Sequence, residues 1–169
     1  MRERARMELG QPARVTLEAL VALDAEAQRL QFDRERVALL MMASQTHGRL
    51  GEARRAERLA IECVETAEIL GDQPLLCDAL NRLGGAVLSE SPSRAYAAFS
   101  RALAISEAIG DVRGQARSYG NLAVAAQFES RLDEAVESYG RAIAVARAGG
   151  MPDLWGLWAL NLGVLTQKC

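Results

Sequence analysis

The sequence predicts an all-α fold in which antiparallel helix pairs repeat along the chain and stack side by side. Three observations predict it. Half of the 169 residues are hydrophobic but only 5% are aromatic, and much of the hydrophobic half is alanine and leucine, which are strong helix formers. Glycine–aspartate joints recur at a fixed spacing, and a second break falls about midway between them. No alternating pattern typical of β-strands competes.

The recurring joints are short corners between helices. Asp33, Asp72 and Asp111 are 39 residues apart, and Gly71 and Gly110 directly precede the last two. Glycine adopts the left-handed conformation that closes a helix. Aspartate accepts hydrogen bonds from the N–H groups that open the next helix. A further joint reads AGGMPD, so each joint is expected to end one helix and begin another with almost no linker.

The midway breaks divide each unit into two antiparallel helices. They read HGRLGEA, SESPSRA and FESRLDEA. Ser91 followed by Pro92 is typical of a helix start, and Ser130 followed by Asp133 resembles a capping box. The predicted helices are 2–9, 12–31, 34–47, 50–70, 73–89, 92–109, 112–128, 131–148 and 153–167.

The repeats organise the whole chain as a single domain. Residues 1–32 are interpreted as a degenerate earlier repeat in which Pro12 opens the second helix. Residues 151–169 are interpreted as the first helix of a further, incomplete repeat. The complete units between them are 33–71, 72–110 and 111–150.

Residues 116–149 resemble a tetratricopeptide repeat of the longer variety, of about 40 residues. The family pattern has a leucine and a small residue in the first helix, then an alanine, an aromatic residue and an alanine in the second. The matching residues here are Leu122, Ala123, Ala135, Tyr139 and Ala142, and in the preceding unit Leu83, Gly84, Ala95, Phe99 and Ala102. A fourth unit begins with Leu162 and Gly163. The small residues are expected to let helices approach closely while the aromatic residue fills the gap between units.

The first unit, 33–71, allows two registers. Its segment GRLGEA aligns Gly48, Leu50 and Ala53 with the turn of the family pattern. Counting back from Gly71 instead favours Gly51, Ala56 and Cys63. The two registers differ by three residues.

The resemblance implies a right-handed superhelix with a concave groove, lined by the first helix of each pair. Similar proteins hold extended peptides there, with asparagines bonded to the peptide backbone. The matching positions are Asn81, Arg82, Arg117, Asn121, Gln127, Phe128 and Asn161, with Arg36 and Met42 as candidates from the first unit. An amide can donate and accept together, and arginine binds carboxylates. The alternative is that these side chains only face water. The full Lys- and Arg-rich clamp of some family members is missing.

Charge and composition exclude several classes of function. The net charge of −2, from 20 basic and 22 acidic residues, argues against a general nucleic-acid binder, which needs a basic face. No run of about 18 apolar residues predicts a membrane span, and the charged N-terminus is unlike a signal peptide. Three scattered cysteines, Cys63, Cys77 and Cys169, do not form a disulfide framework. We expect a cytoplasmic protein.

Catalytic, cofactor and metal sites are not expected. His47 has no cysteine or second histidine at ligand spacing, so a helix-end or packing role is favoured. Cys63 and Cys77 are interpreted as buried thiols. Gly84 and Gly85 precede no phosphate-loop lysine and are interpreted as a close helix contact. No nucleophile–base pair is apparent, and the chain is predicted not to be an enzyme.

The C-terminal helix is apolar almost all round. It carries Trp155, Leu157, Trp158, Leu160, Leu162, Val164 and Leu165. Repeat arrays normally end in a polar cap, so three interpretations stay open. The natural chain continues, this helix pairs with a second copy in a homo-oligomer, or Trp155 and Trp158 form a partner surface.

These features predict a scaffold that binds a peptide or partner protein segment in its groove. The alternative is a sensor or regulatory segment of a larger bacterial signalling or transcription regulator, with a small inducer in the groove. Repeats of this long type resemble those found beside nucleotide-binding and DNA-binding domains in such regulators.

Overall fold

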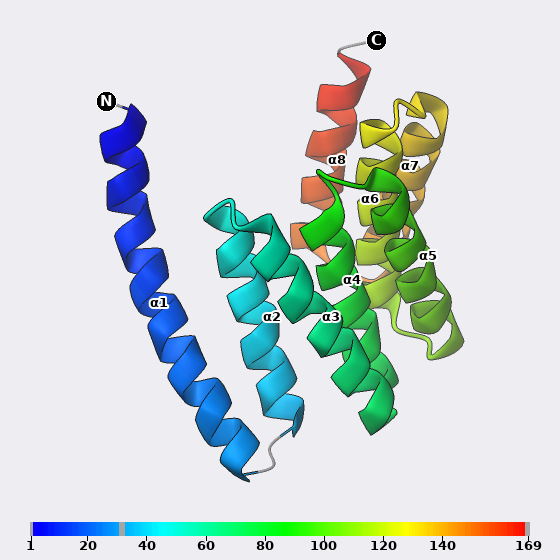
Figure 1. Ribbon diagram of the computed structural model, residues 1–169. Coiled ribbons are helices and arrows are strands. Elements are labelled where there is room, and N and C mark those ends of the chain that lie inside the picture. Colours follow the sequence, from blue (N-terminus) through cyan, green and yellow to red (C-terminus); the bar gives the residue numbers. More distant parts are fainter. Residues whose placement is uncertain (1, 31–32, 168–169) are drawn as a thin grey trace.

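The computed structural model describes residues 2–30 and 33–167, with side chains over 12–28 and 33–167. The described residues form α-helices and no strand, which confirms the all-helical prediction (Figure 1). The helices are α1 (Arg2–Leu30), α2 (Asp33–Arg49), α3 (Ala53–Leu70), α4 (Gln73–Val87), α5 (Pro92–Ala108), α6 (Val112–Phe128), α7 (Leu132–Ala148) and α8 (Pro152–Thr166).

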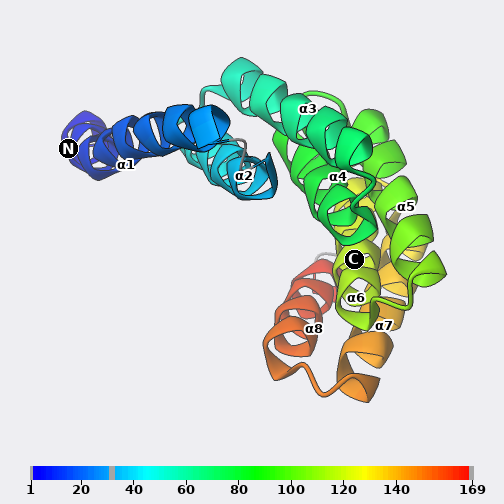
Figure 2. The same cartoon turned by 90° about the horizontal axis from the view of Figure 1, so that it is seen from below.

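Each helix packs against the next one along the chain, and the pairs α2/α3, α4/α5 and α6/α7 stack into a curved array (Figure 2). The first helices of successive pairs also contact one another, from α2 to α4, α6 and α8. Within the described residues, the second helices α3, α5 and α7 make no such contact. Because the first helices crowd together and the second helices spread apart, the first helices line the inside of the curve.

Two of the predicted joints have the expected local chemistry. Gly71 and Gly110 adopt left-handed backbone angles, with φ of 64° and 70°. Oδ1 of Asp72 accepts a hydrogen bond from the backbone N–H of Leu75 at 3.0 Å. In the next joint, Oδ1 of Asp111 accepts one from Gly114 N–H at the same distance. These bonds satisfy N–H groups that have no partner within the helix.

The third joint uses different residues. Gly150 is the left-handed residue, with φ of 65°. Met151 occupies the capping position without a side-chain bond, and Asp153 lies inside the first turn of α8. Oδ2 of Asp153 instead accepts a hydrogen bond from Nη2 of Arg113 at 2.6 Å. The third corner therefore closes without an aspartate cap.

Three local predictions need correction. The predicted break between helices 2–9 and 12–31 is wrong, because α1 runs through Pro12; a proline removes only one backbone donor, and the flanking turns continue the helix. Ser130 is not a cap: its φ is 60° and Arg131 precedes α7 without a side-chain bond. Ser91 does precede Pro92 at the start of α5, but its hydroxyl makes no capping bond.

The first unit follows the register counted back from Gly71. Gly51 forms the turn with φ of 77°, and Ala56 and Cys63 are buried. Gly48, which the other register placed in the turn, lies within α2. The physical reason for this register is the left-handed backbone conformation of the turn, which is strained for residues with a side chain but is readily adopted by glycine.

Small residues and aromatic rings fill the space between units as predicted. Phe99 is buried with Val87, Leu122 and Ala125, and a Cβ on Gly84 would overlap the Phe99 ring. Tyr139 is buried in the next unit together with Trp158. None of the helices in the described part of the chain combines the length and apolarity needed to cross a bilayer.

Candidate binding groove

The concave face of α4 and α6 carries a hydrogen-bonded asparagine pair. Asn81 is buried, and its Nδ2–H donates to the Cys77 carbonyl at 3.0 Å and to Ser118 Oγ at 3.2 Å. Its Oδ1 accepts from Nδ2–H of Asn121 at 2.8 Å. The prediction that Asn81 faces the groove is therefore wrong. It holds Asn121, which is only half-buried.

Arg117 is paired with a carboxylate in the folded chain. Its Nη2 lies 2.5 Å from Oδ1 of Asp78, and both side chains are about two-fifths exposed, at 38% and 43%. The sequence analysis offered Arg117 as a residue that grips a carboxylate of a partner. Asp78 of the same face already occupies that role, so this arginine contributes little unpaired positive charge.

Arg82 has no such partner. It forms no ion pair within the described residues, and its Nε is buried without a hydrogen-bond acceptor. Burial is the main cause that lowers the pKa of its guanidinium; the positive charges of Arg117 and Arg49 also lower this pKa, whereas Cys63 and Asp78 raise it. Arg49, at the end of α2, is exposed and also lacks an ion pair among the described side chains. Two arginines without acidic partners thus lie near each other on neighbouring first helices.

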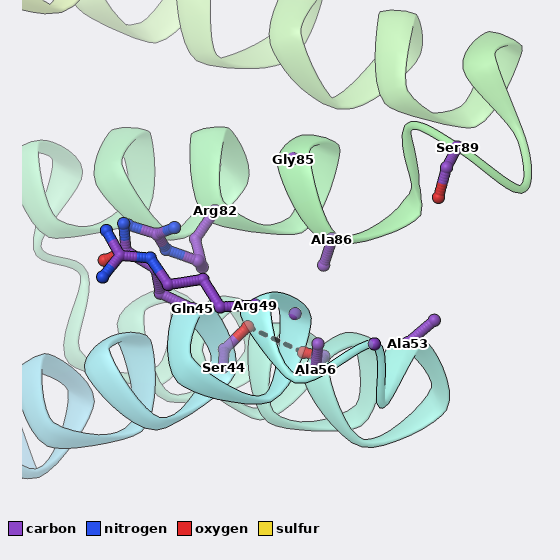
Figure 3. Close-up of a pocket in the computed structure, with 11 residues that line it drawn as sticks. Ser44, Gln45, Arg49, Ala53, Ala56, Arg82, Gly85, Ala86 and Ser89 are labelled. Atoms are coloured by element: carbon purple, nitrogen blue, oxygen red, sulfur yellow. Dashed lines mark hydrogen bonds between the residues drawn. The ribbon is translucent and has the colours of Figure 1, made fainter. Parts of the chain in front are cut away.

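A cavity of about 460 Å³ lies beside these two arginines. Figure 3 shows their head groups together with the Gln45 side chain at one end of the cavity, and Ser89 at the other. Small residues form most of the remaining wall: Ser44, Gly48, Gly51, Ala53, Ala56, Gly85 and Ala86. The cavity is therefore positively charged at one end and lined by short side chains elsewhere.

Sequence analysis missed Gln45 and Arg49 because the first unit had two possible registers. It named Arg36 and Met42 from that unit instead. Arg36 is half-buried and ion-paired with Asp24, at 3.0 Å, and with Glu62, so it ties α1 and α3 to α2. Met42 is exposed on α2, outside the cavity. The left-handed turn at Gly51 is the signal that would have placed Arg49 in the last turn of α2.

The remaining predicted groove residues are dispersed. Gln127 lies at the end of α6, where its Oε1 accepts a hydrogen bond from the Tyr139 hydroxyl at 3.3 Å. Phe128, the last residue of α6, is exposed. Asn161 is half-buried on α8 and has no hydrogen-bond partner among the described residues. The seven candidates therefore do not form one cluster.

The two tryptophans of α8 do not form the predicted exposed surface. Trp158 is buried against α6 and α7: a Cβ on Gly120 would overlap its indole, and the Tyr139 ring centroid lies 6.2 Å away. Trp155 is half-buried, with the guanidinium of Arg147 4.9 Å from its ring centroid. The exposed apolar residues of α8 are Leu157, Leu160 and Val164.

The residues considered for chemistry have packing or helix-end roles. His47 Nδ1 lies 2.7 Å from Oε2 of Glu52 across the α2–α3 turn. Burial raises the pKa of the Cys63 thiol to about 12 and also raises that of Cys77, which confirms two buried thiols; Cys169 lies outside the described residues.

Among the described residues, no group of three side chains that could hold a metal ion is found. Gly84 makes the predicted close contact, whereas a Cβ on Gly85 would meet open space.

Comparison with known proteins supports the architecture alone. No family model and no curated protein matches the chain. Among solved structures, it is similar to BtubC (BKLC) from P. vanneervenii, with a TM-score of 0.80 and 21% sequence identity. The match covers 92% of this chain and 66% of that one. At this identity the similarity shows a shared helical solenoid fold.

Proposed function

We propose that this chain is a tetratricopeptide-type interaction module that binds an extended peptide or partner segment on its concave face. The supporting observation is the Asn81–Asn121 pair. One N–H of Asn121 is held by Asn81 at 2.8 Å, which leaves its carbonyl oxygen and second N–H for a peptide group. An amide anchored in this way presents a donor and an acceptor in a fixed orientation, which lowers the entropic cost of binding.

The proposed module is not catalytic and acts in the reducing cytoplasm. Two thiols, Cys63 and Cys77, are present as free cysteines in the described part of the chain, which fits a compartment that keeps thiols reduced. A peptide or protein is the proposed partner, and the near balance of acidic and basic residues gives no reason to propose nucleic acid.

A selection from a random peptide library on the immobilised chain tests this proposal. Fluorescence anisotropy then measures the affinity of an enriched peptide for the wild type, for Asn121→Ala and for Glu65→Ala. Glu65 is exposed on α3, on the outer side of the array, and serves as the control. We expect about a tenfold weaker affinity for Asn121→Ala, the effect of losing one or two hydrogen bonds, and none for Glu65→Ala. Failure to enrich any peptide, or equal affinities for all three proteins, would contradict the proposal.

The second candidate function is a sensor segment of a larger bacterial regulator with a small inducer. The cavity between α2 and α4 favours it, because its volume of about 460 Å³ lies in the range of small-molecule sites. A thermal-shift screen with a metabolite library separates the two candidates: a low-molecular-mass ligand that stabilises the chain in the absence of peptide supports the sensor.

A second copy of this chain, paired through α8, is the second partner that we propose. Leu157, Leu160 and Val164 are exposed on that helix at spacings that place them on one face. Light scattering at two dilute concentrations tests it, and a Leu160→Glu variant is the matched comparison. A concentration-independent monomer would contradict it.

A further inference from the structure

Arg49 and Arg82, neither of which forms an ion pair with a described residue, and the cavity beside them define a site that the proposed peptide groove does not require. Most arginines on the described surface are neutralised within the chain, such as Arg117 by Asp78 at 2.5 Å and Arg94 by Glu57 at 2.7 Å. Arg49 and Arg82 are brought together by the direct contact of α2 with α4, and neither forms an ion pair with a carboxylate of the described residues.

Holding two guanidinium groups close together without an anion is unfavourable. Arg82 Nε is buried and lacks an acceptor, and a buried donor without a partner costs free energy. Like charges at short range add to that cost. A bound oxyanion offsets the repulsion between the like charges, because its oxygens accept hydrogen bonds from N–H groups of both guanidinium groups and its negative charge screens them.

The shape of the cavity limits what carries the oxyanion. Figure 3 shows the arginine head groups at one end, Gly85 and Ala86 along one wall, and Ser89 at the far end. Side chains this short leave room for a ligand body of a few carbon atoms. Gln45, beside the arginines, adds an amide N–H that can donate a hydrogen bond to a carboxylate oxygen.

We propose that the cavity between α2 and α4 binds a small organic carboxylate, with the carboxylate between Arg49 and Arg82 and the carbon chain against Gly85 and Ala86. This assignment rests on the second candidate function, for which it names the class of ligand, and it does not depend on whether the concave face binds a peptide. The planar guanidinium forms two parallel hydrogen bonds to a carboxylate as it does to a phosphate, and the wall of Gly85 and Ala86 offers contact to the carbon chain that an organic carboxylate carries and inorganic phosphate lacks.

The test uses the full chain labelled with nitrogen-15 and follows the arginine Nε–H signals by nuclear magnetic resonance during titration with butyrate. A fragment of this size is expected to bind in the millimolar range, with saturable shifts of the Arg82 signal. Butyramide, which has the same shape without the charge, is expected to cause no saturable shift. Inorganic phosphate is titrated separately to distinguish a carboxylate site from a general anion site.

Three variants locate the contact. Arg49→Gln and Arg82→Gln are each expected to weaken butyrate binding about tenfold or more, the effect of losing a charged hydrogen-bond donor. Arg58→Gln is the matched control, because Arg58 is exposed on α3 without an ion pair among the described side chains and its loss changes the net charge equally. Arg49 is exposed, so Arg49→Gln keeps the test valid if Arg82→Gln fails to fold.

Two results would overturn the assignment. One is the absence of a saturable shift with butyrate, whether or not inorganic phosphate produces such a shift. The other is an equal loss of affinity in Arg58→Gln, which would mean that net charge and not this cavity governs binding. Peptide selection on the concave face is a separate measurement, so either proposal can fail without the other.

Discussion

Arg117 of α6 and Asp78 of α4 occupy equivalent positions in consecutive first helices, and their side chains meet at 2.5 Å on the concave face. The separation of 39 residues equals the spacing of the predicted repeat. One repeat position therefore carries opposite charges in neighbouring units. Asp78 therefore neutralises the positive charge of Arg117 that the sequence analysis assigned to partner binding.

Reversing the charge of Arg117 is expected to destabilise the fold modestly. Arg117→Glu places a second carboxylate beside Asp78, and for a pair that is about two-fifths exposed the loss is roughly 0.5–1 kcal/mol, because solvent screens the interaction. Urea unfolding measures it. The exchanged pair Asp78→Arg/Arg117→Glu restores most of the stability, and a double variant no more stable than Arg117→Glu would contradict the pairing.

Replacement by alanine is expected to change the stability of the fold in opposite directions at the adjacent glycines Gly84 and Gly85 of α4. Gly84→Ala drives a methyl group into the buried Phe99 ring, and overpacking of this kind costs about 1–3 kcal/mol. Gly85→Ala meets open space, so the better helix propensity of alanine stabilises the chain by about 0.5–1 kcal/mol. Thermal unfolding of both variants checks the pair. Equal shifts in the same direction would show that the assigned packing is wrong.

The two tryptophans of α8 are expected to differ in their contribution to stability. Trp158→Ala removes a buried indole from the contact with Tyr139 and costs about 3–5 kcal/mol. Trp155→Ala removes a half-buried ring that contacts Arg147, for which a loss of about 1 kcal/mol or less is expected. Chemical unfolding of each variant measures the two losses, and a larger loss for Trp155→Ala would refute this placement of α8.

Acid is expected to weaken the α2–α3 turn through Glu52. Hydrogen bonds from His47 and then Arg55 hold the pKa of the Glu52 carboxyl below its ordinary value of 4.5. A carboxyl with a lowered folded-state pKa stabilises the fold above its unfolded pKa, and this contribution is lost as pH falls through the folded value. The wild type should therefore melt at a higher temperature than Glu52→Gln near neutral pH, and the difference should shrink below pH 4.5. A difference that does not change with pH would contradict this role.

Local chemistry explains why the helices and most joints could be predicted. A left-handed glycine and a capping aspartate act within about four residues, so Gly71–Asp72 and Gly110–Asp111 end and begin helices in any tertiary context. Pro12 and Ser130 show the limit of such rules. Each resembles a helix start, but the helix through Pro12 continues and the backbone at Ser130 turns to a φ of 60°.

The sequence by itself determined an all-helical chain, its 39-residue period and the small residues that allow close packing. Tertiary structure alone decided which polar side chains face the groove. The rotation of α4 against α6 buries Asn81 beneath Asn121, and the contact of α2 with α4 brings Arg49 to Arg82. The physical reason is that helix formation depends on neighbours along the chain, whereas these contacts join residues more than 30 positions apart, whose geometry is set by how whole helices pack.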